Sequence, residues 1–73
     1  MKTLNQIEIG KKGIVKHINA EQKLKRRLMD MGFTKGTSFF VKKVAPLGDP
    51  IQITIRGYEI SVRKADAFFI EVE

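Results

Sequence analysis

The sequence predicts a small, mostly β domain: a barrel of about five strands, with one α-helix inserted between the first and second main strands. Two patterns predict this class, a strict alternation of apolar residues over 51–62 and a helical spacing of apolar residues over 20–31. The length of 73 residues indicates one domain, residues 1–73, that buries about 60% of the unfolded chain's surface. A flat sheet of this size would keep one wet face and unpaired edges, so we expect it to curl into a barrel.

The first main strand is predicted over 14–18. This segment is short and rich in β-branched residues, and Gly10 and Gly13 flank a lysine pair just before it. These features favour a strand that is entered through a turn and ends near Asn19.

The helix is predicted over 20–31. Asn19 and Gln22 have the spacing of an N-cap and a capping box, which places the helix start at Ala20. Apolar residues then follow at positions i, i+4 and i+7 and form one stripe, namely Leu24, Leu28 and Met31. Gly32 stands where helices commonly end in a left-handed residue, so we expect about three turns.

The second main strand is predicted over 37–44, which is rich in strand-forming residues. The adjacent Phe39 and Phe40 interrupt its alternation and leave open which ring faces the core. Residues 46–50 contain two prolines and one glycine, so we expect a rigid surface loop after this strand.

The clearest alternation belongs to two further strands, 51–55 and 58–62. Between them, Arg56-Gly57 offers a tight connection with glycine at a position suited to positive φ, so the pair should form an antiparallel hairpin. Residues 64–67 have room for one helical turn, and 69–72 for a closing strand. The complete set of elements predicts an SH3-like barrel with the inserted 20–31 helix.

The composition indicates a cytoplasmic protein that attracts negatively charged partners. Fourteen Lys and Arg against eight Asp and Glu give a net charge of +6, which attracts acidic protein surfaces, anionic lipid or nucleic acid.

The longest apolar run, residues 67–70, is far shorter than the roughly 20 residues that cross a bilayer. No secretory signal is expected, because no apolar segment follows the first residues. With no cysteine, disulfides and thiolate metal sites are excluded.

Neither catalysis nor a resident cofactor is predicted. The chain has one histidine, no cysteine and no glycine-rich phosphate loop. Its carboxylates are dispersed without the spacing of a calcium or zinc site, so no dedicated metal site is expected. His17 lies beside Lys16 on a predicted strand, where a surface or half-buried strand role outweighs that of a ligand.

Four cations fall within five residues in the first half of the predicted helix: Lys23, Lys25, Arg26 and Arg27. The helix dipole favours negative charge there, so local electrostatics oppose this arrangement. On a helical wheel Arg27 flanks the apolar stripe and can anchor to the barrel, whereas Arg26 and Met29 point outward. The cluster is therefore either a solvated basic face or a surface that meets a partner.

Residues 26–37, Arg-Arg-Leu-Met-Asp-Met-Gly-Phe-Thr-Lys-Gly-Thr, resemble the signature of the FeoA family, small cytoplasmic proteins of bacterial ferrous-iron uptake. The resemblance continues through 45–50, 57–58 and 62–67 and covers nearly the whole chain, residues 4–72. Scattered over so many turns and strands, the match is hard to obtain by chance.

The resemblance implies an SH3-like barrel that acts with FeoB, the membrane ferrous-iron transporter with a cytoplasmic GTPase part, as an accessory and not as the pore. Departures from the family are modest, because Met29 and Met31 replace the typical Leu and Lys35 replaces a frequent Pro. The same fold is similar to the C-terminal domain of DtxR-type metal-dependent repressors. This chain lacks the helix-turn-helix and metal-ligand cluster of those proteins, which argues against a regulator role.

Together, the residues and the resemblance predict a protein-binding surface rather than a reactive pocket. The candidate partner-binding residues are Lys25, Arg26, Met29, Leu47, Gly48 and Asp49. The cations would steer the encounter with the transporter's cytoplasmic part, while Met29 and Leu47 would supply apolar contact. Neither membrane insertion nor nucleic acid is expected, and homo-oligomerisation stays open.

Two other functions are alternatives at this point. A small barrel with a charge of +6 can follow a phosphate backbone, with Phe39, Phe40 or Tyr58 stacking on bases. Against this nucleic-acid role, a small core uses most of the six aromatic residues. The other alternative is a self-assembling scaffold module whose exposed barrel edges pair between subunits.

Overall fold

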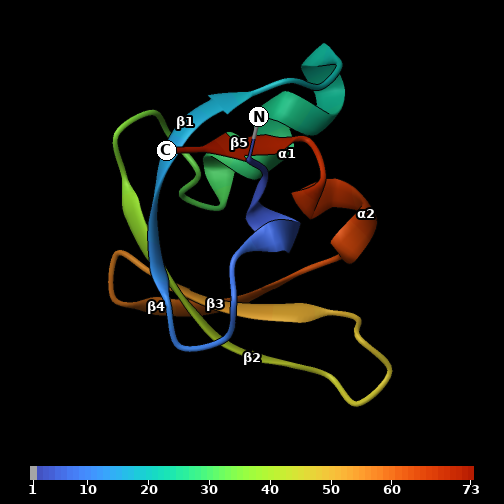
Figure 1. Ribbon diagram of the computed structural model, residues 1–73. Helices are drawn as coiled ribbons and strands as arrows, with labels where there is room; N and C mark the ends of the chain where they lie inside the picture. The colour runs from blue at the N-terminus through green and yellow to red at the C-terminus, as the bar shows by residue number, and fades with distance from the viewer. Residues whose placement is uncertain (1) are drawn as a thin grey trace.

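The computed structural model describes residues 2–73 and contains five strands, one main helix and two short helical turns (Figure 1). In chain order the elements are η1 (Leu4–Gln6), β1 (Lys12–Ile18), α1 (Gln22–Asp30), β2 (Ser38–Val44), β3 (Ile51–Ile55), β4 (Tyr58–Val62), α2 (Lys64–Ala67) and β5 (Ile70–Val72). The predicted order of strands and helices is confirmed, except that η1 was not predicted. Within the described residues, no helix combines the length and the apolar character that a membrane crossing requires.

The sheet is antiparallel, with the order β4-β3-β2-β1-β5 (Figure 1). It curls at β1, because one end of this strand pairs with β2 and the other end pairs with β5. Residues 12–14 of β1 pair with β2, whereas Val15, His17 and Ile18 pair with β5. The register shifts between Val15 and His17, and an irregularity of this kind bends a strand. The bend in β1 carries the sheet around a corner, as the prediction of a small barrel requires.

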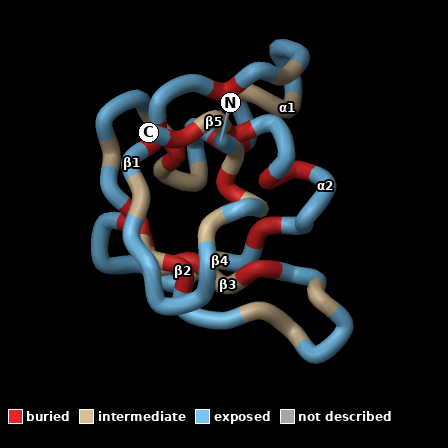
Figure 2. The backbone as a smooth tube through the Cα atoms, viewed as in Figure 1, coloured by how far each residue is buried: buried red, intermediate tan, exposed pale blue. Residues whose placement is uncertain are grey.

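The core fills the inside of the curled sheet, and buried positions alternate with partly buried ones along β3 and β5 (Figure 2). Ile51, Ile53 and Ile55 of β3 are all buried, as their spacing predicted. Phe39 is buried whereas Phe40 is only partly so, which settles which of the two rings faces inward. Leu4 of η1 joins the same cluster with no exposed surface, so the N-terminal segment closes the core.

The predicted helix start is wrong. The helix α1 begins at Gln22, its N-cap is Glu21, and no side chain caps it. Asn19 lies two residues before this N-cap, and its backbone N–H donates to Phe69 O at 2.8 Å, which ties it to the segment that leads into β5. A tertiary contact therefore overrides the local capping signal, and the helix runs over Gln22–Asp30 instead of 20–31.

The helix end follows the prediction and depends on Gly32. Met31 is the C-cap of the helix and has right-handed helical dihedrals, and Gly32 follows with a φ of 113°. Phe33 N donates to Leu28 O at 3.1 Å and Gly32 N donates to Met29 O at 3.0 Å, which is the Schellman arrangement. This turn brings Phe33 into the same core cluster as Leu28.

The β3–β4 hairpin is confirmed, with Ile55 and Tyr58 paired across a two-residue turn. Both turn residues have positive φ, 53° for Arg56 and 82° for Gly57. Positive φ at both positions matches the right-handed twist of the flanking strands. The turn therefore requires left-handed dihedrals at an arginine as well as at the predicted glycine.

Gly13 lies inside β1 and not in the turn that precedes the strand. It pairs in register with Phe39 of β2, and a Cβ on Gly13 would lie 2.4 Å from Phe39 Cζ. The absence of a side chain at this position therefore lets the Phe39 ring lie against the β1 backbone.

The two ends of the described chain meet beside β5. Val72 N donates to Lys2 O at 2.9 Å, and Thr3 forms an isolated bridge with Glu71 (Figure 1). The N-terminal segment thus lies against the closing strand.

Candidate protein-binding surface

The helix α1 buries one face and exposes the other. Leu28 is buried, and Leu24 and Met31 pack against the core as partly buried residues, so the predicted stripe is confirmed. On the other side, Arg26 is exposed and Met29 has 43% of its surface exposed. The outward position predicted for these two residues is therefore confirmed.

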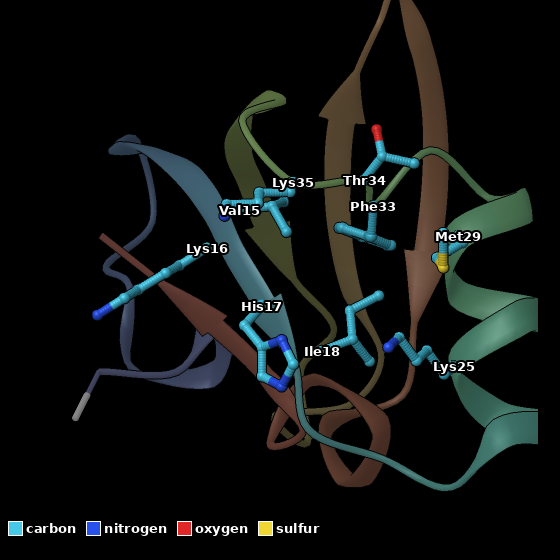
Figure 3. Close-up of a pocket in the computed structure, with 9 residues that line it drawn as sticks. All are labelled: Val15, Lys16, His17, Ile18, Lys25, Met29, Phe33, Thr34 and Lys35. Carbon is cyan, nitrogen blue, oxygen red and sulfur yellow. The ribbon is translucent and has the colours of Figure 1, made fainter.

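A groove lies between β1 and α1 and has a volume of about 230 Å³ (Figure 3). We call it the β1–α1 groove; its lining residues are Val15, Lys16, His17, Ile18, Lys25, Met29, Phe33, Thr34 and Lys35. Lys25 and Met29 extend into it from the helix, opposite Ile18 of the strand (Figure 3). Two of the predicted partner-binding residues thus face a concave surface.

A second hollow lies on the outer side of α1, with a volume of about 480 Å³. It is lined by Gln22, Lys25, Arg26, Met29 and Asp30. Lys25 and Met29 therefore stand between this hollow and the β1–α1 groove. The structure brings together the three candidate residues of the helix.

The other three candidates are in a separate part of the molecule. Leu47, Gly48 and Asp49 belong to the loop that joins β2 and β3, and this loop extends to the lower right in Figure 1, whereas α1 lies at the top. Leu47 is 96% exposed. The Asp49 Oδ1 atom accepts a hydrogen bond of 2.9 Å from Lys64 N at the start of α2, which fixes the loop to that helix. The predicted surface therefore divides into a helix part and a loop part.

Arg27 is anchored as predicted, and its partner is Asp66. Arg27 Nη2 donates to Asp66 Oδ2 at 3.4 Å, and Arg63 Nε donates to the same oxygen at 3.0 Å. The Asp66 side chain is only 12% exposed. One carboxylate thus holds α1 to α2, a role that the sequence analysis missed although the Arg63-x-x-Asp66 spacing suits a local pair.

The pair Lys42–Glu59 connects β2 to β4 across β3. Lys42 Nζ donates to Glu59 Oε1 at 2.8 Å, and both side chains are largely exposed. The hydrogen bond and the charge of Lys42 lower the pKa of Glu59 below its ordinary value of 4.5. Because the pair is open to solvent, its contribution to stability is small.

The described residues contain no group of three or more His, Asp or Glu side chains placed to hold a metal ion. His17 is exposed on β1, in register with Glu71 of β5. Within residues 2–73, each buried side-chain nitrogen or oxygen has a hydrogen-bond partner.

The aromatic residues proposed for base stacking are not equivalent. Phe39 is buried, Phe40 is partly buried, and Tyr58 is 73% exposed. Phe39 is therefore not available to a base. The other exposed rings are Phe68 and Phe69, which meet edge to face with centroids 5.7 Å apart.

Comparison with protein families gives a match over almost the entire chain. The FeoA domain model matches residues 2–73. The chain belongs to the FeoA family. An FeoA-like protein from Clostridium acetobutylicum, whose structure was determined by NMR, is 45% identical. Its TM-score is 0.90, and the match covers 97% of this chain and 83% of that one. The resemblance inferred from residues 26–37 is thereby confirmed.

A relative in Porphyromonas gingivalis is a fusion of two proteins in one polypeptide. It is an Fe(2+) transport protein A/Fe(2+) transporter FeoB fusion protein, 33% identical over 70 residues. The match covers 96% of this chain but only 8% of the fusion protein. The FeoA chain described here thus corresponds to a small part of that relative.

More distant structures share the fold alone. The zinc-complexed FeoA of Stenotrophomonas maltophilia, described as a prokaryotic SH3 domain protein, is 22% identical with a TM-score of 0.87, over 100% of this chain and 91% of that one. A manganese-dependent transcriptional repressor is 19% identical with a TM-score of 0.86, over 97% of this chain and 40% of the repressor. The predicted SH3-like fold and its similarity to repressor domains are therefore confirmed.

The residues that carry the FeoA resemblance have mainly structural roles in this chain. Leu28, Gly32 and Phe33 form the end of α1, and Asp66 receives Arg27. The exposed Arg26 and Met29 lie within the same segment. The family signature therefore stabilises the end of α1, and the exposed residues of the candidate surface lie on this helix.

Proposed function

We propose that this chain is a cytoplasmic accessory protein of ferrous-iron transport and that it acts by binding the cytoplasmic GTPase part of a FeoB transporter. The observation that carries the proposal is the Porphyromonas gingivalis relative, in which an FeoA segment and a FeoB transporter are one polypeptide. Fusion keeps two modules at a high effective concentration, which is advantageous for domains that must associate.

The chemistry of the α1 surface supports this role. Lys25 and Arg26 line the same hollow as the exposed Met29, together with Gln22 and Asp30, so two cations and one carboxylate accompany an exposed apolar side chain. Positive charge accelerates encounter with an acidic partner, and a flexible Met adapts to the partner's apolar contacts. The net charge of +6 extends this attraction beyond the contact itself.

The β2–β3 loop supplies a second contact in this proposal. Leu47 is the most exposed of the large hydrophobic side chains in the described residues. The molecule measures 30 × 24 × 21 Å along its principal axes, so a membrane transporter is large enough to touch the loop and the helix together. We expect the chain to contribute binding and no catalytic step.

Retention on the purified full-length transporter in detergent tests the proposal. The native chain should be retained, and an Arg26→Glu/Met29→Glu double variant should lose at least about tenfold in affinity, because hot-spot residues commonly contribute that much. The matched control is Ile9→Glu/Lys12→Glu, which changes one exposed apolar residue and one exposed cation away from α1.

The outcomes separate the function from the surface. If the native chain is not retained, the proposed function is wrong. If the native chain is retained and the α1 variant, folded by circular dichroism, binds equally well, the helix assignment is wrong. Equal losses from the α1 variant and the control would show that charge alone, without a defined surface, drives the association.

A further inference from the structure

The curled sheet has two edge strands, β4 and β5, and the chain itself covers the β5 edge. Val72 N donates to Lys2 O at 2.9 Å, and Thr3 forms a bridge with Glu71. At the other edge, β4 pairs with β3 and with no further strand of the described residues. An open edge carries unpaired N–H and C=O groups, so the β4 edge is the place where another strand can join this sheet.

The β3–β4 register identifies the backbone groups that point outward from β4. The residues that flank a two-residue hairpin turn form a hydrogen-bonded pair, here Ile55 with Tyr58. Hydrogen-bonded and non-hydrogen-bonded pairs then alternate along an antiparallel ladder. Glu59 and Ser61 fall at non-hydrogen-bonded positions, and both residues are exposed. Their N–H and C=O groups therefore point toward the open edge.

β4 has few of the features that protect edge strands from pairing. It contains neither proline nor lysine, and its five residues pair with β3 without a register shift. Glu59 is its one charged residue, and Lys42 already pairs with that carboxylate. Proteins commonly prevent edge-to-edge contact with prolines, lysines or bulges, so the edge of β4 is free to accept a strand.

A second copy of β4 matches this edge. When two β4 strands run antiparallel about a two-fold axis at Ile60, Glu59 of each copy lies opposite Ser61 of the other. Each such pair can exchange both of its backbone hydrogen bonds, because both residues present outward N–H and C=O groups. The same register places the Glu59 carboxylate diagonally across from the Arg63 guanidinium of the second copy, within reach of a long side chain. The edge is therefore self-complementary, as a two-fold interface requires.

Tyr58 supplies a side chain for the same interface. Its residue is 73% exposed, and in this register it lies opposite Val62 of the second copy. A hollow of about 260 Å³ lies at that end of β4, beside α1. Its lining residues are Arg27, Met31, Ser61, Val62, Arg63 and Asp66. Because side chains directly opposite each other at a non-hydrogen-bonded pair are close, the Tyr58 ring can enter the hollow of the second copy.

The chemistry of the hollow suits an aromatic ring. Asp66 holds the Arg27 and Arg63 guanidinium groups in place, with N–O distances of 3.4 and 3.0 Å. A guanidinium group attracts the face of an aromatic ring, and a methionine sulfur such as that of Met31 also packs well against one. The exposed Tyr58 ring and the hollow therefore complement each other.

We propose that two copies of this chain associate through their β4 edges, with Glu59 paired to Ser61 and Tyr58 inserted beside Val62 of the opposite copy. A five-residue edge buries less area than the roughly 1,200 Å² of the smaller stable complexes. The association is therefore weak, with a Kd of about 0.1–1 mM. Arg26 and Met29 lie outside this interface, so the inference does not rest on the proposed function.

Sedimentation equilibrium of the full chain tests this inference over about 0.05–2 mM protein. A salt concentration of about 0.5 M screens the repulsion between two copies that each carry a charge of +6. The average mass should rise with concentration and level off at that of a dimer. Over the same range, ¹⁵N amide shifts should change at residues 58–63, 27 and 31 and stay constant in β5.

Two matched pairs of variants locate the interface. Ser61→Pro removes an outward N–H, a change that edge strands tolerate, and should weaken association by at least about tenfold. Ser61→Ala keeps this N–H and should stay within about twofold of the native chain. Tyr58→Ser should also lose at least about tenfold, whereas Phe68→Ser removes a ring that is 60% exposed outside β4 and should have no effect.

The inference is overturned if the mass remains that of a monomer at about 2 mM, or if it grows beyond a dimer, because pairing of β4 with β4 closes the edge. It is also overturned if the concentration-dependent shifts lie outside β4 and the hollow, or if Tyr58→Ser and Phe68→Ser behave alike. A folded Ser61→Pro variant that associates as well as Ser61→Ala contradicts it too. If Ser61→Pro loses the hairpin amide signals, the Tyr58 and Phe68 variants decide the outcome.

Discussion

At the residue scale, Gly13 determines how closely β1 and β2 approach. The tip of the Phe39 ring occupies the space that a Cβ at position 13 would need, and Phe39 is 3% exposed within the core cluster. Packed interiors of proteins tolerate added atoms poorly, so the glycine is required for packing and not for its backbone freedom.

A Gly13→Ala substitution should therefore destabilise the protein by about 1–3 kcal/mol. The measurement is the free energy of unfolding by urea. In a Phe39→Leu background the same substitution should cost less, because the smaller side chain leaves room for the new methyl group. Equal costs in both backgrounds would show that steric conflict with Phe39 is not the cause.

Asp66 is the residue on which the two helices converge, and its carboxylate accepts hydrogen bonds from Arg27 and Arg63. An Asp66→Asn substitution keeps the shape but removes the charge. Both arginines are largely exposed and therefore screened by solvent, so the loss should be about 1 kcal/mol.

Urea unfolding at two salt concentrations measures this loss. Asp30→Asn, an exposed acid-to-amide change on α1, is the control and should stay within about 0.5 kcal/mol of the native protein. A loss that does not shrink at high salt, or that the control reproduces, would contradict the role assigned to the Arg–Asp66–Arg cluster.

At the element scale, the hairpin shows which features of the fold could be predicted from local sequence. Apolar residues alternate with a period of two in β3 and β4, and the two turn residues suit a tight connection. Both signals therefore predicted the same hairpin. The start of α1 could not be predicted in this way. Asn19 carries a capping signal, but its backbone N–H donates to the carbonyl oxygen of Phe69, fifty residues later in the chain, and the helix begins after it. Pairings between distant segments leave no trace in a short window.

The Lys42–Glu59 pair gives a prediction that depends on pH. The pKa of the Glu59 carboxyl should lie below 4.5 when followed by NMR titration. A lowered pKa means that the pair stabilises the fold above that ordinary value and that this stabilisation is lost as the pH falls through the lowered pKa. In a Lys42→Met variant the Glu59 pKa should return toward 4.5. An unchanged titration curve in the variant would exclude Lys42 as the cause.

At the scale of the whole molecule, the candidate surface could be predicted only as a set of residues. Exposure of Arg26, Met29 and Leu47 followed from helical spacing and loop composition. The separation of the loop from α1 depends on how the curled sheet places the β2–β3 connection, and one hydrogen bond from Lys64 to Asp49 fixes it there. The β1–α1 groove escaped prediction for the same reason, since its walls come from segments that meet only in the folded chain.

The separation predicts independent contributions from the two parts. Met29→Glu and Leu47→Glu should each weaken binding to the full-length transporter, and the double variant should show the product of the two fold-changes within about twofold. Affinity measured by interferometry on immobilised transporter would check this. A Leu47→Glu variant that binds like the native chain would remove the loop from the surface, and strong non-additivity would show that the two parts act as one.

The hydrogen bond between Val72 and Lys2 has a consequence for how such a domain is carried by a larger protein. Because both ends lie at one corner, a polypeptide continuing from either of them would depart from the same place, and the β2–β3 connection points elsewhere (Figure 1). Tethering at that corner costs the domain none of its internal strand pairings, since adjacent ends are the usual condition under which domains tolerate insertion. A tethered copy can thus pivot about one attachment point and search nearby surfaces.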